Sequence, residues 1–239
     1  IRLVKEKKTV TVKNHAHIGA EGVEDVIVPG DYRTDCALVE TEFYQVILDQ
    51  KKGIAAIIDK KDGKNLIRED AAYPAFTGIY EVTDMKGQAC ECRRRMGRNR
   101  KDTSTLRYAG RLKDIQIVEN GPVYVAVRLD YELTGTGFYS IFLKVYKELP
   151  RIESTVRIHK DSVWEPENLY ISLPFTARED EVKYLDKTGC IIRPGIDQLP
   201  GTNMEFYLLQ TGIVMEGGDK TLTLAIKDAP MVTFGSLDT

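Results

Sequence analysis

The sequence predicts an all-β fold, an antiparallel β-sandwich with little or no helix. Apolar and polar residues alternate with period two through residues 123–133, where Val, Leu and Tyr occupy the odd positions. Similar short segments recur along the chain about every ten residues, separated by turn residues. No segment of about twelve residues or more has the 3.6-residue apolar period of an amphipathic helix.

The first part of the chain predicts an edge strand followed by a meander. Residues 1–13 alternate Lys with Val and Thr, as an edge strand with one solvated face does. Residues 20–36 are rich in Gly, Asp, Glu and Pro and are typical of a loop. Residues 38–70 predict strands joined by two tight turns, at 50–53 and at 61–64, where Asp-Gly is a hairpin signal.

The remainder continues as short strands. Residues 71–92 are ambiguous, apart from a predicted strand at 77–82 and a weaker one at 89–92. The later expected strands lie at 123–133, 141–145, 152–158, 169–175, 206–215, 221–227 and 231–235.

The length of 239 residues fits one large β domain or two small ones. We expect residues 1–37 to form an opening strand and loop segment, and residues 38–239 to form a single β-sandwich domain. The chain begins with Ile1 instead of Met, so we expect it to be a fragment of a longer polypeptide.

The composition narrows the classes of partner. A net charge of −2 and a pI of about 6.0 give no electrostatic reason to expect a nucleic-acid partner. No run of about eighteen apolar residues predicts a membrane helix, and we expect no membrane partner. The spacing of Cys36, Cys90, Cys92 and Cys190 fits neither a CxxC metal site nor a dense disulfide framework. Reduced thiols favour a cytoplasmic location.

Two short motifs carry side chains that could bind a ligand. His15 and His17 would share one face of a strand, as two metal ligands do, but no carboxylate or Cys completes a set nearby. Residues 93–101, RRRMGRNRK, carry six basic side chains that could bind phosphate or an acidic sugar. Because no aromatic residue is interleaved, a solvated hairpin tip is the favoured interpretation. No metal site is predicted.

No catalytic residue is predicted. The chain has neither a P-loop nor a GxGxxG motif, and no Ser or Cys has the context of an activated nucleophile. Asp186, Asp197 and Glu205 are candidates for a glycosidase carboxylate pair, although each also fits a surface or capping acid. Trp164 and Tyr170 could present flat faces to a sugar ring, but a buried core position is the more common one for such residues.

The strongest candidate site is the segment 186–210. Two Pro and three Gly fix its backbone around a group of polar residues, and a rigid polar loop between strands is the usual place for a binding surface. The predicted substrate-binding residues are Arg193, Asp197, Gln198, Thr202 and Asn203. The alternative is a long connection whose polar groups satisfy only their own backbone.

Four motifs, in the same order along the chain, carry a resemblance to a known family. They are LVETEFYQVILDQKKGIAAIIDKKDGKNLI from Leu38, NLYISLPF from Asn168, RPGIDQLPGTNMEFY from Arg193 and LAIKDAPMVTFG from Leu224. Together they resemble the C-terminal β-sandwich of glycoside hydrolase family 38, the α-mannosidases.

The resemblance implies a galactose-mutarotase-like supersandwich and a parent protein that is a retaining, metal-dependent α-mannosidase. In that family the nucleophile and the ligands for the divalent metal ion, zinc or calcium, belong to an N-terminal catalytic domain. We therefore expect no cofactor in this chain and no activity from it alone. The expected partners are an α-mannoside carbohydrate and the catalytic domain of the same polypeptide, and a homo-oligomer is compatible with the same features. By analogy, the loop 193–203 is expected to face the substrate or the domain interface.

Two other functions stay open. A mutarotase-like sugar epimerase shares the fold, and Asn14-His15-Ala16 is similar to a short mutarotase motif. Such an enzyme needs a paired His and Glu, and His159 is the other histidine available. A stand-alone carbohydrate-binding module would need an exposed aromatic platform. Fold alone does not choose among these functions.

Overall fold

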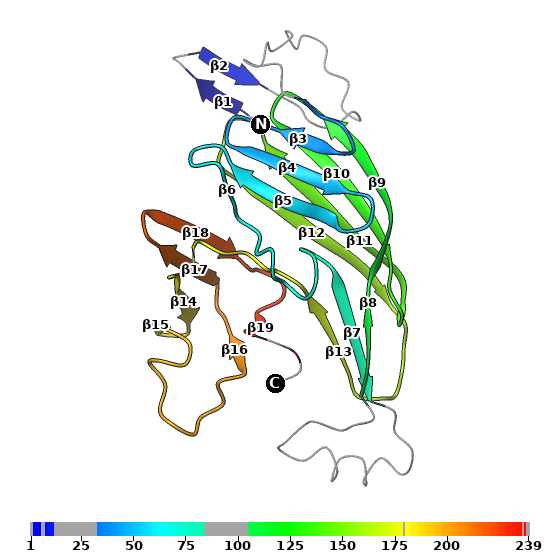
Figure 1. Ribbon diagram of the computed structural model, residues 1–239, viewed down its shortest axis with the longest axis vertical. Coiled ribbons are helices and arrows are strands. Elements are labelled where there is room, and N and C mark those ends of the chain that lie inside the picture. The colour runs from blue at the N-terminus through cyan, green and yellow to red at the C-terminus, as the bar shows by residue number, and fades with distance from the viewer. Residues whose placement is uncertain are drawn as a thin grey trace. The chain divides into compact units, whose positions relative to one another are not determined.

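The computed structural model describes residues 2–5, 8–11, 33–83, 105–178, 180–235 and 237. Within these ranges the secondary structure consists of β-strands in antiparallel sheets, with no helix (Figure 1). The prediction of an all-β antiparallel fold is confirmed. Contacts divide the chain into two compact units, unit 1 from Ile1 to Pro174 and unit 2 from Phe175 to Thr239. The assignment of residues 38–239 to one domain stays a prediction.

The long strands of unit 1 form one four-stranded sheet. Its order is β12-β11-β10-β9, with β9 at Arg111–Asn120, β10 at Tyr124–Glu132, β11 at Thr136–Tyr146 and β12 at Ile152–Lys160. The six apolar residues predicted to share one face of 123–133 are all buried. On the opposite face, Arg128 and Asp130 form an ion pair at 2.6 Å. The period-two pattern therefore identified the core face of β10 correctly.

A second four-stranded sheet packs on this one. It contains β3 (Leu38–Glu40), β4 (Tyr44–Asp49), β5 (Gly53–Asp59) and β6 (Lys64–Asn65), in chain order. A Cβ at Gly53 would lie 2.5 Å from the Tyr131 hydroxyl and 3.2 Å from Leu129, so the β4–β5 turn lies directly on β10. Gly53 and Gly63 have positive φ angles of 77° and 70°, as the two predicted turns require. Unit 1 is thus a β-sandwich.

A third sheet completes unit 1. Its order is β13-β7-β8, with β7 at Gly78–Thr83, β8 at Thr105–Ala109 and β13 at Glu167–Ile171. The buried hydroxyl of Tyr139 donates a 2.7 Å hydrogen bond to the carbonyl of Phe76, just before β7. A Cβ at Gly78 would lie 2.7 Å from Leu133. These contacts attach the third sheet to the ends of β10 and β11.

The N-terminal prediction of one edge strand over residues 1–13 is wrong. The backbone there forms two short strands, β1 (Arg2–Lys5) and β2 (Lys8–Thr11), which pair antiparallel with each other. The alternation of Lys with Val and Thr is the same in one strand as in a hairpin, so it could not separate the two.

Unit 2 contains two small sheets. The first has the order β15-β14-β17-β18, with β14 at Val182–Lys187, β15 at Cys190–Ile192, β17 at Gly212–Gly217 and β18 at Lys220–Ala225. The second pairs β16 (Phe206–Leu208) with β19 (Met231–Thr233). The core of unit 2 is a cluster of buried residues from both sheets and the segments beside them: Ala177, Leu185, Tyr207, Leu209, Ile213 and Met215.

The predicted strand at 206–215 is interrupted in the structure. Residues 206–208 pair with β19, whereas β17 starts at Gly212 and pairs with β14 and β18. One strand was expected over the whole segment, but its two ends pair with different strands. The sequence also predicts a hairpin of 206–215 with 221–227, and the structure confirms the reversal with shorter strands, β17 (Gly212–Gly217) and β18 (Lys220–Ala225).

Candidate functional site

The predicted substrate loop lies in unit 2, between the end of β15 and the start of β16. Gly195 and Gly201 have φ angles of 75° and 84°, a region that residues with a Cβ rarely adopt. A Cβ added at either position would have no atom within 4 Å. Glycine is therefore needed there for its backbone angle and not because space is short. The expectation that glycines set the shape of this loop is confirmed.

Arg193 and Asp197 bind each other within the loop. The Arg193 Nε and Nη2 atoms donate to the two Asp197 carboxylate oxygens at 3.0 and 2.7 Å, and the Arg193 backbone N–H adds a third bond at 2.8 Å. These bonds to the arginine lower the pKa of Asp197 to about 2 and raise the pKa of Arg193. The pair is exposed, so its contribution to global stability is small.

The other three predicted residues also bond inside the loop. The side-chain oxygen of Gln198 accepts a hydrogen bond from the Gly195 backbone N–H at 3.0 Å. The side-chain NH2 group of Gln198 donates to the Asn203 backbone carbonyl at 3.2 Å. The Thr202 hydroxyl donates to the Leu199 carbonyl at 2.8 Å. The Asn203 side-chain oxygen accepts from the backbone N–H groups of Glu205 and Phe206 at 2.8 and 3.3 Å.

All five residues therefore lie together in one loop, and the hydrogen bonds described use them to fix its backbone. This is the geometry expected of the alternative interpretation, in which polar side chains satisfy their own loop. It also makes the loop preorganised, which lowers the entropy cost of binding anything to it. The assignment of these residues to substrate binding stays a prediction.

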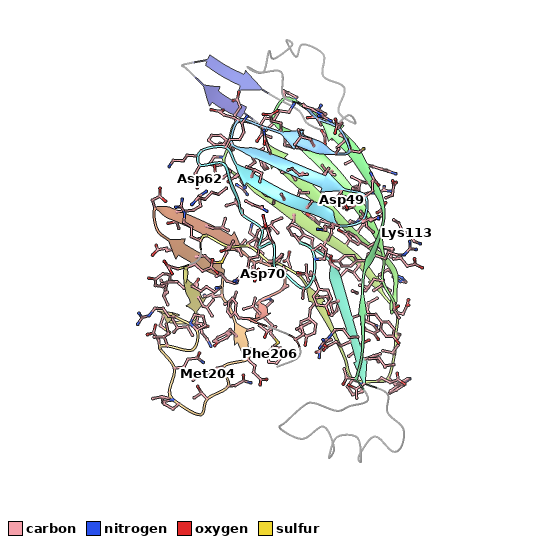
Figure 2. All side chains as sticks on the ribbon, in the orientation of Figure 1. Asp49, Asp62, Asp70, Lys113, Met204 and Phe206 are labelled. Atoms are coloured by element: carbon pink, nitrogen blue, oxygen red, sulfur yellow. The ribbon has the colours of Figure 1, made fainter. Side chains whose placement is uncertain are left out.

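The loop presents apolar side chains to solvent, a feature that the sequence reasoning missed. Ile196 is 64% exposed and Leu199 is 78% exposed. Figure 2 labels Met204 on the same loop and Phe206 where β16 begins. On the neighbouring strand pair, Leu208 and Met231 face each other and are also more than half exposed. The signal was present as apolar residues between the Gly and Pro positions, where polar residues are the norm in loops.

A small hollow of about 140 Å³ lies on the outer face of the β15-β14-β17-β18 sheet. Gly212 is one of its lining residues and lies close to the backbone of β18. A Cβ added at Gly212 would be 2.1 Å from the Leu224 carbonyl oxygen, so only glycine fits there. Its charged group, Asp186, accepts a hydrogen bond from the Thr211 hydroxyl. The lining is Tyr184, Asp186, Ile191, Thr211, Gly212, Ile213, Val214, Thr223, Leu224 and Ala225. A mostly apolar hollow without convergent polar groups lacks the features of a catalytic pocket.

A family model, the C-terminal domain of the glycosyl hydrolases of family 38, matches residues 39–226. The chain belongs to this family. The match crosses the boundary between Pro174 and Phe175, so the family domain includes both units. A search of curated proteins found no matching relative.

The motifs that carried the resemblance have clear places in this family-38 C-terminal domain. The motif from Leu38 forms the sheet of β3 to β6, and the motif from Asn168 covers most of β13 and continues to Phe175. The motif from Arg193 is the candidate loop with the start of β16, and the motif from Leu224 leads through to β19.

The described residues of the domain offer no metal centre. No group of three or more His, Cys, Asp or Glu side chains within them is arranged to hold an ion. His15, His17, Cys90, Cys92 and the basic run 93–101 lie outside the described residues. Cys36 and Cys190 are free and exposed. The part of the chain that the structure describes contains no helix that could cross a membrane.

Three residues that the sequence offers for sugar chemistry lie in unit 1. His159 is on β12, where its ring stacks on Phe138 with 5.8 Å between centroids. Trp164 is 94% exposed, so the expectation of a buried core position is wrong for this residue. It lies in the loop between β12 and β13, and no sheet among the described residues covers it. Tyr170, on β13, is partly buried.

Proposed function

We propose that this chain is the non-catalytic accessory domain of an α-mannosidase-like glycoside hydrolase, and that the loop 193–203 is part of its contact with the catalytic domain. The observation that carries the proposal is the division of roles in the loop. Its polar groups are bonded within the loop, while Ile196 and Leu199 are exposed. A fixed loop with apolar side chains outward suits docking against another protein surface better than hydrogen bonding to a sugar.

The chemistry of the parent protein is assigned to its catalytic domain. There the proposed reaction is hydrolysis of α-mannosidic bonds, and a zinc or calcium ion would be held there too. The described residues of this chain do not fit a metal site, so no step of the reaction is assigned to them. A cytoplasmic location is part of the proposal, supported by the free thiols Cys36 and Cys190.

The first test is hydrolysis of an aryl α-mannoside, with added Zn²⁺ or Ca²⁺, by this chain and by the longer protein that carries it. We expect turnover only by the longer protein. Turnover by this chain alone would overturn the accessory role. No turnover by either would overturn the assignment of the parent reaction.

The second test separates docking from substrate contact in the longer protein. Replacing Ile196 and Leu199 together by Ser removes two apolar contacts, and we expect kcat/KM to fall by about tenfold or more. Leu106→Ser, at an exposed site on β8, is the matched control and should leave kcat/KM unchanged. If Arg193→Ala and Asp197→Ala raise KM while the Ser variants have no effect, the loop contacts substrate and the docking role is wrong.

A further inference from the structure

The loop from Asp161 to Pro166 is anchored at both ends. The Asp161 N–H donates to the Gly135 carbonyl at 3.0 Å, and the Thr83 N–H donates to the Pro166 carbonyl at 2.9 Å. The Lys160 ammonium also donates to the Asp161 carbonyl. The backbone on each side of the loop tip is therefore held by β7, β12 and the β10–β11 turn.

The tip of this anchored loop presents an indole to water. Trp164 is 94% exposed, so both faces of its ring reach solvent, and Val163 beside it is 38% exposed. An exposed Trp leaves on the order of 200 Å² of largely apolar surface in water without stabilising the core. Such a position stabilises nothing in the fold, which points to a ligand for the ring.

A fixed set of polar groups lies next to the loop. Tyr80 Oη and Lys160 Nζ both donate to the same Glu167 oxygen, Oε2, each at 2.7 Å. The Lys160 ammonium also lies 5.0 Å from the centre of the Tyr80 ring. Within the described part of the chain, Glu167 Oε1 has no hydrogen-bond partner and is open to a further donor.

The protonation states of this set are well defined. Burial and the neighbouring Glu167 raise the pKa of Tyr80 to about 12, so its hydroxyl stays protonated. Burial would raise the pKa of Glu167, but the bonds from Lys160 and Tyr80 outweigh it and the pKa is lowered. Glu167 is therefore an ionised acceptor at neutral pH.

The charge of the loop selects the class of ligand. Three carboxylates, those of Asp161, Glu165 and Glu167, accompany the single ammonium of Lys160. Among residues 160–167, this excess of carboxylates disfavours a nucleic-acid backbone and an anionic membrane surface. One indole is a flat platform and not the cage of several aromatic rings that holds a quaternary ammonium ion. A neutral, hydroxyl-rich ring fits both the platform and the acceptors.

We propose that Trp164 is the stacking platform of a glycan-binding site, which takes a pyranose ring of a neutral polysaccharide and offers it the carboxylates of Asp161, Glu165 and Glu167 as hydroxyl acceptors. The site lies in unit 1 and does not depend on the docking role of the loop in unit 2. It gives the domain a means of holding the carbohydrate chain.

The sequence makes the test specific, because the chain contains one tryptophan. Its fluorescence reports on Trp164 alone. The probe is a soluble α-mannan, with a neutral β-glucan as the second polysaccharide. We expect red-shifted emission and full acrylamide quenching in the free chain. A blue shift and protection from quenching on adding either polysaccharide support the site.

Affinity measurements with variants assign the contact. Trp164→Ala should weaken polysaccharide binding by about tenfold, the loss of an aromatic contact, and Trp164→Tyr should retain most of the affinity. Glu167→Gln should weaken it severalfold, since a charged acceptor becomes a neutral one. Val118→Ala, at an exposed site on β9, is the control and should not change it. Because Trp164 is exposed, its variants keep the melting temperature of the parent chain.

Three results would overturn the site. They are no spectral change with either polysaccharide, a change only with phosphatidylserine vesicles, and a change only with a trimethyl-lysine peptide. These readouts involve no hydrolysis. Failure here and failure of the accessory role are therefore distinguishable.

Discussion

The two units of this domain bury their apolar residues to very different extents. In unit 1, β10 and β11 have apolar residues with no exposed surface at successive alternate positions, such as Val125, Val127, Ile141 and Leu143. Unit 2 has one small buried cluster, and several of its large apolar side chains are mostly exposed, among them Ile191, Ile196 and Leu199. A large sandwich has enough interior to bury the apolar side chains of its own strands, whereas a unit of about 65 residues does not. Exposed apolar surface in unit 2 is thus the place to look for a protein partner.

The largest expected effect compares one buried leucine from each unit. Leu143 and Leu185 are both fully buried, and replacement by Ala costs about 2–5 kcal/mol at such sites. We expect Leu143→Ala to lower the unfolding midpoint of unit 1 while it stays folded. Leu185→Ala should leave unit 2 unfolded at room temperature, since a core of this size rarely supplies more than about 3–5 kcal/mol. Hydrogen exchange followed unit by unit measures both, and equal loss of protection in both units would show that they unfold together.

The next prediction concerns the buried ion pair of unit 1, in contrast to the exposed pair of Arg193 and Asp197 in unit 2. Glu81 is 8% exposed and accepts from Arg107 at 2.6 and 2.7 Å, so Arg107→Met leaves a buried charge unpaired. We expect unit 1 to lose about 3 kcal/mol. Adding Glu81→Leu should recover most of that loss, because no buried charge then remains. Denaturant titration measures all three proteins, and a double variant no better than the single one would contradict the explanation.

A third comparison uses glycine. Gly212 in unit 2 has backbone where a side chain would go, and Gly212→Ala should cost about 2 kcal/mol because the Leu224 carbonyl cannot move freely. Gly63 in unit 1 has open space but a φ of 70°, and Gly63→Ala should cost about 1 kcal/mol through backbone strain. Thermal unfolding of the two variants gives the order. A larger loss at Gly63 would contradict the packing at Gly212.

The smallest effect is local to the loop of unit 2. Bonding to Arg193 lowers the pKa of Asp197 from an ordinary value of 3.8 to about 2. The stabilisation is therefore fully present above the unfolded pKa and is lost as the pH falls through about 2. We expect the NMR signals of Arg193 Nε–H and backbone N–H to titrate at about pH 2. In Asp197→Asn the same signals should show no such titration and the midpoints of both units should not change. A titration near 3.8 in the parent chain would mean that the pair is open in solution.

Periodicity and turn chemistry accounted for much of the fold. The buried face of β10, the reversals at Gly53 and Gly63, and the hairpin of β17 and β18 follow from local sequence, because strand faces alternate and particular turns require glycine. The same local information failed at residues 206–215, where pairing partners lie far away in sequence. It also failed at residues 1–13, where one strand and a hairpin share a pattern.

The candidate site shows the same division. Local sequence located the polar loop and its fixed glycines, and the order of four motifs pointed to the family-38 C-terminal domain that the family model matches. It could not say that Arg193 and Asp197 would bind each other, because side-chain pairing depends on the path of the loop in space. Nor could it place Trp164, since burial is decided by what other segments cover.

The sequence by itself determined an all-β chain of this family, with its strand faces and turns. Only the tertiary structure decided which polar groups are already satisfied and which apolar side chains are exposed, because the first depends on the path of the loop in space and the second on what other segments cover.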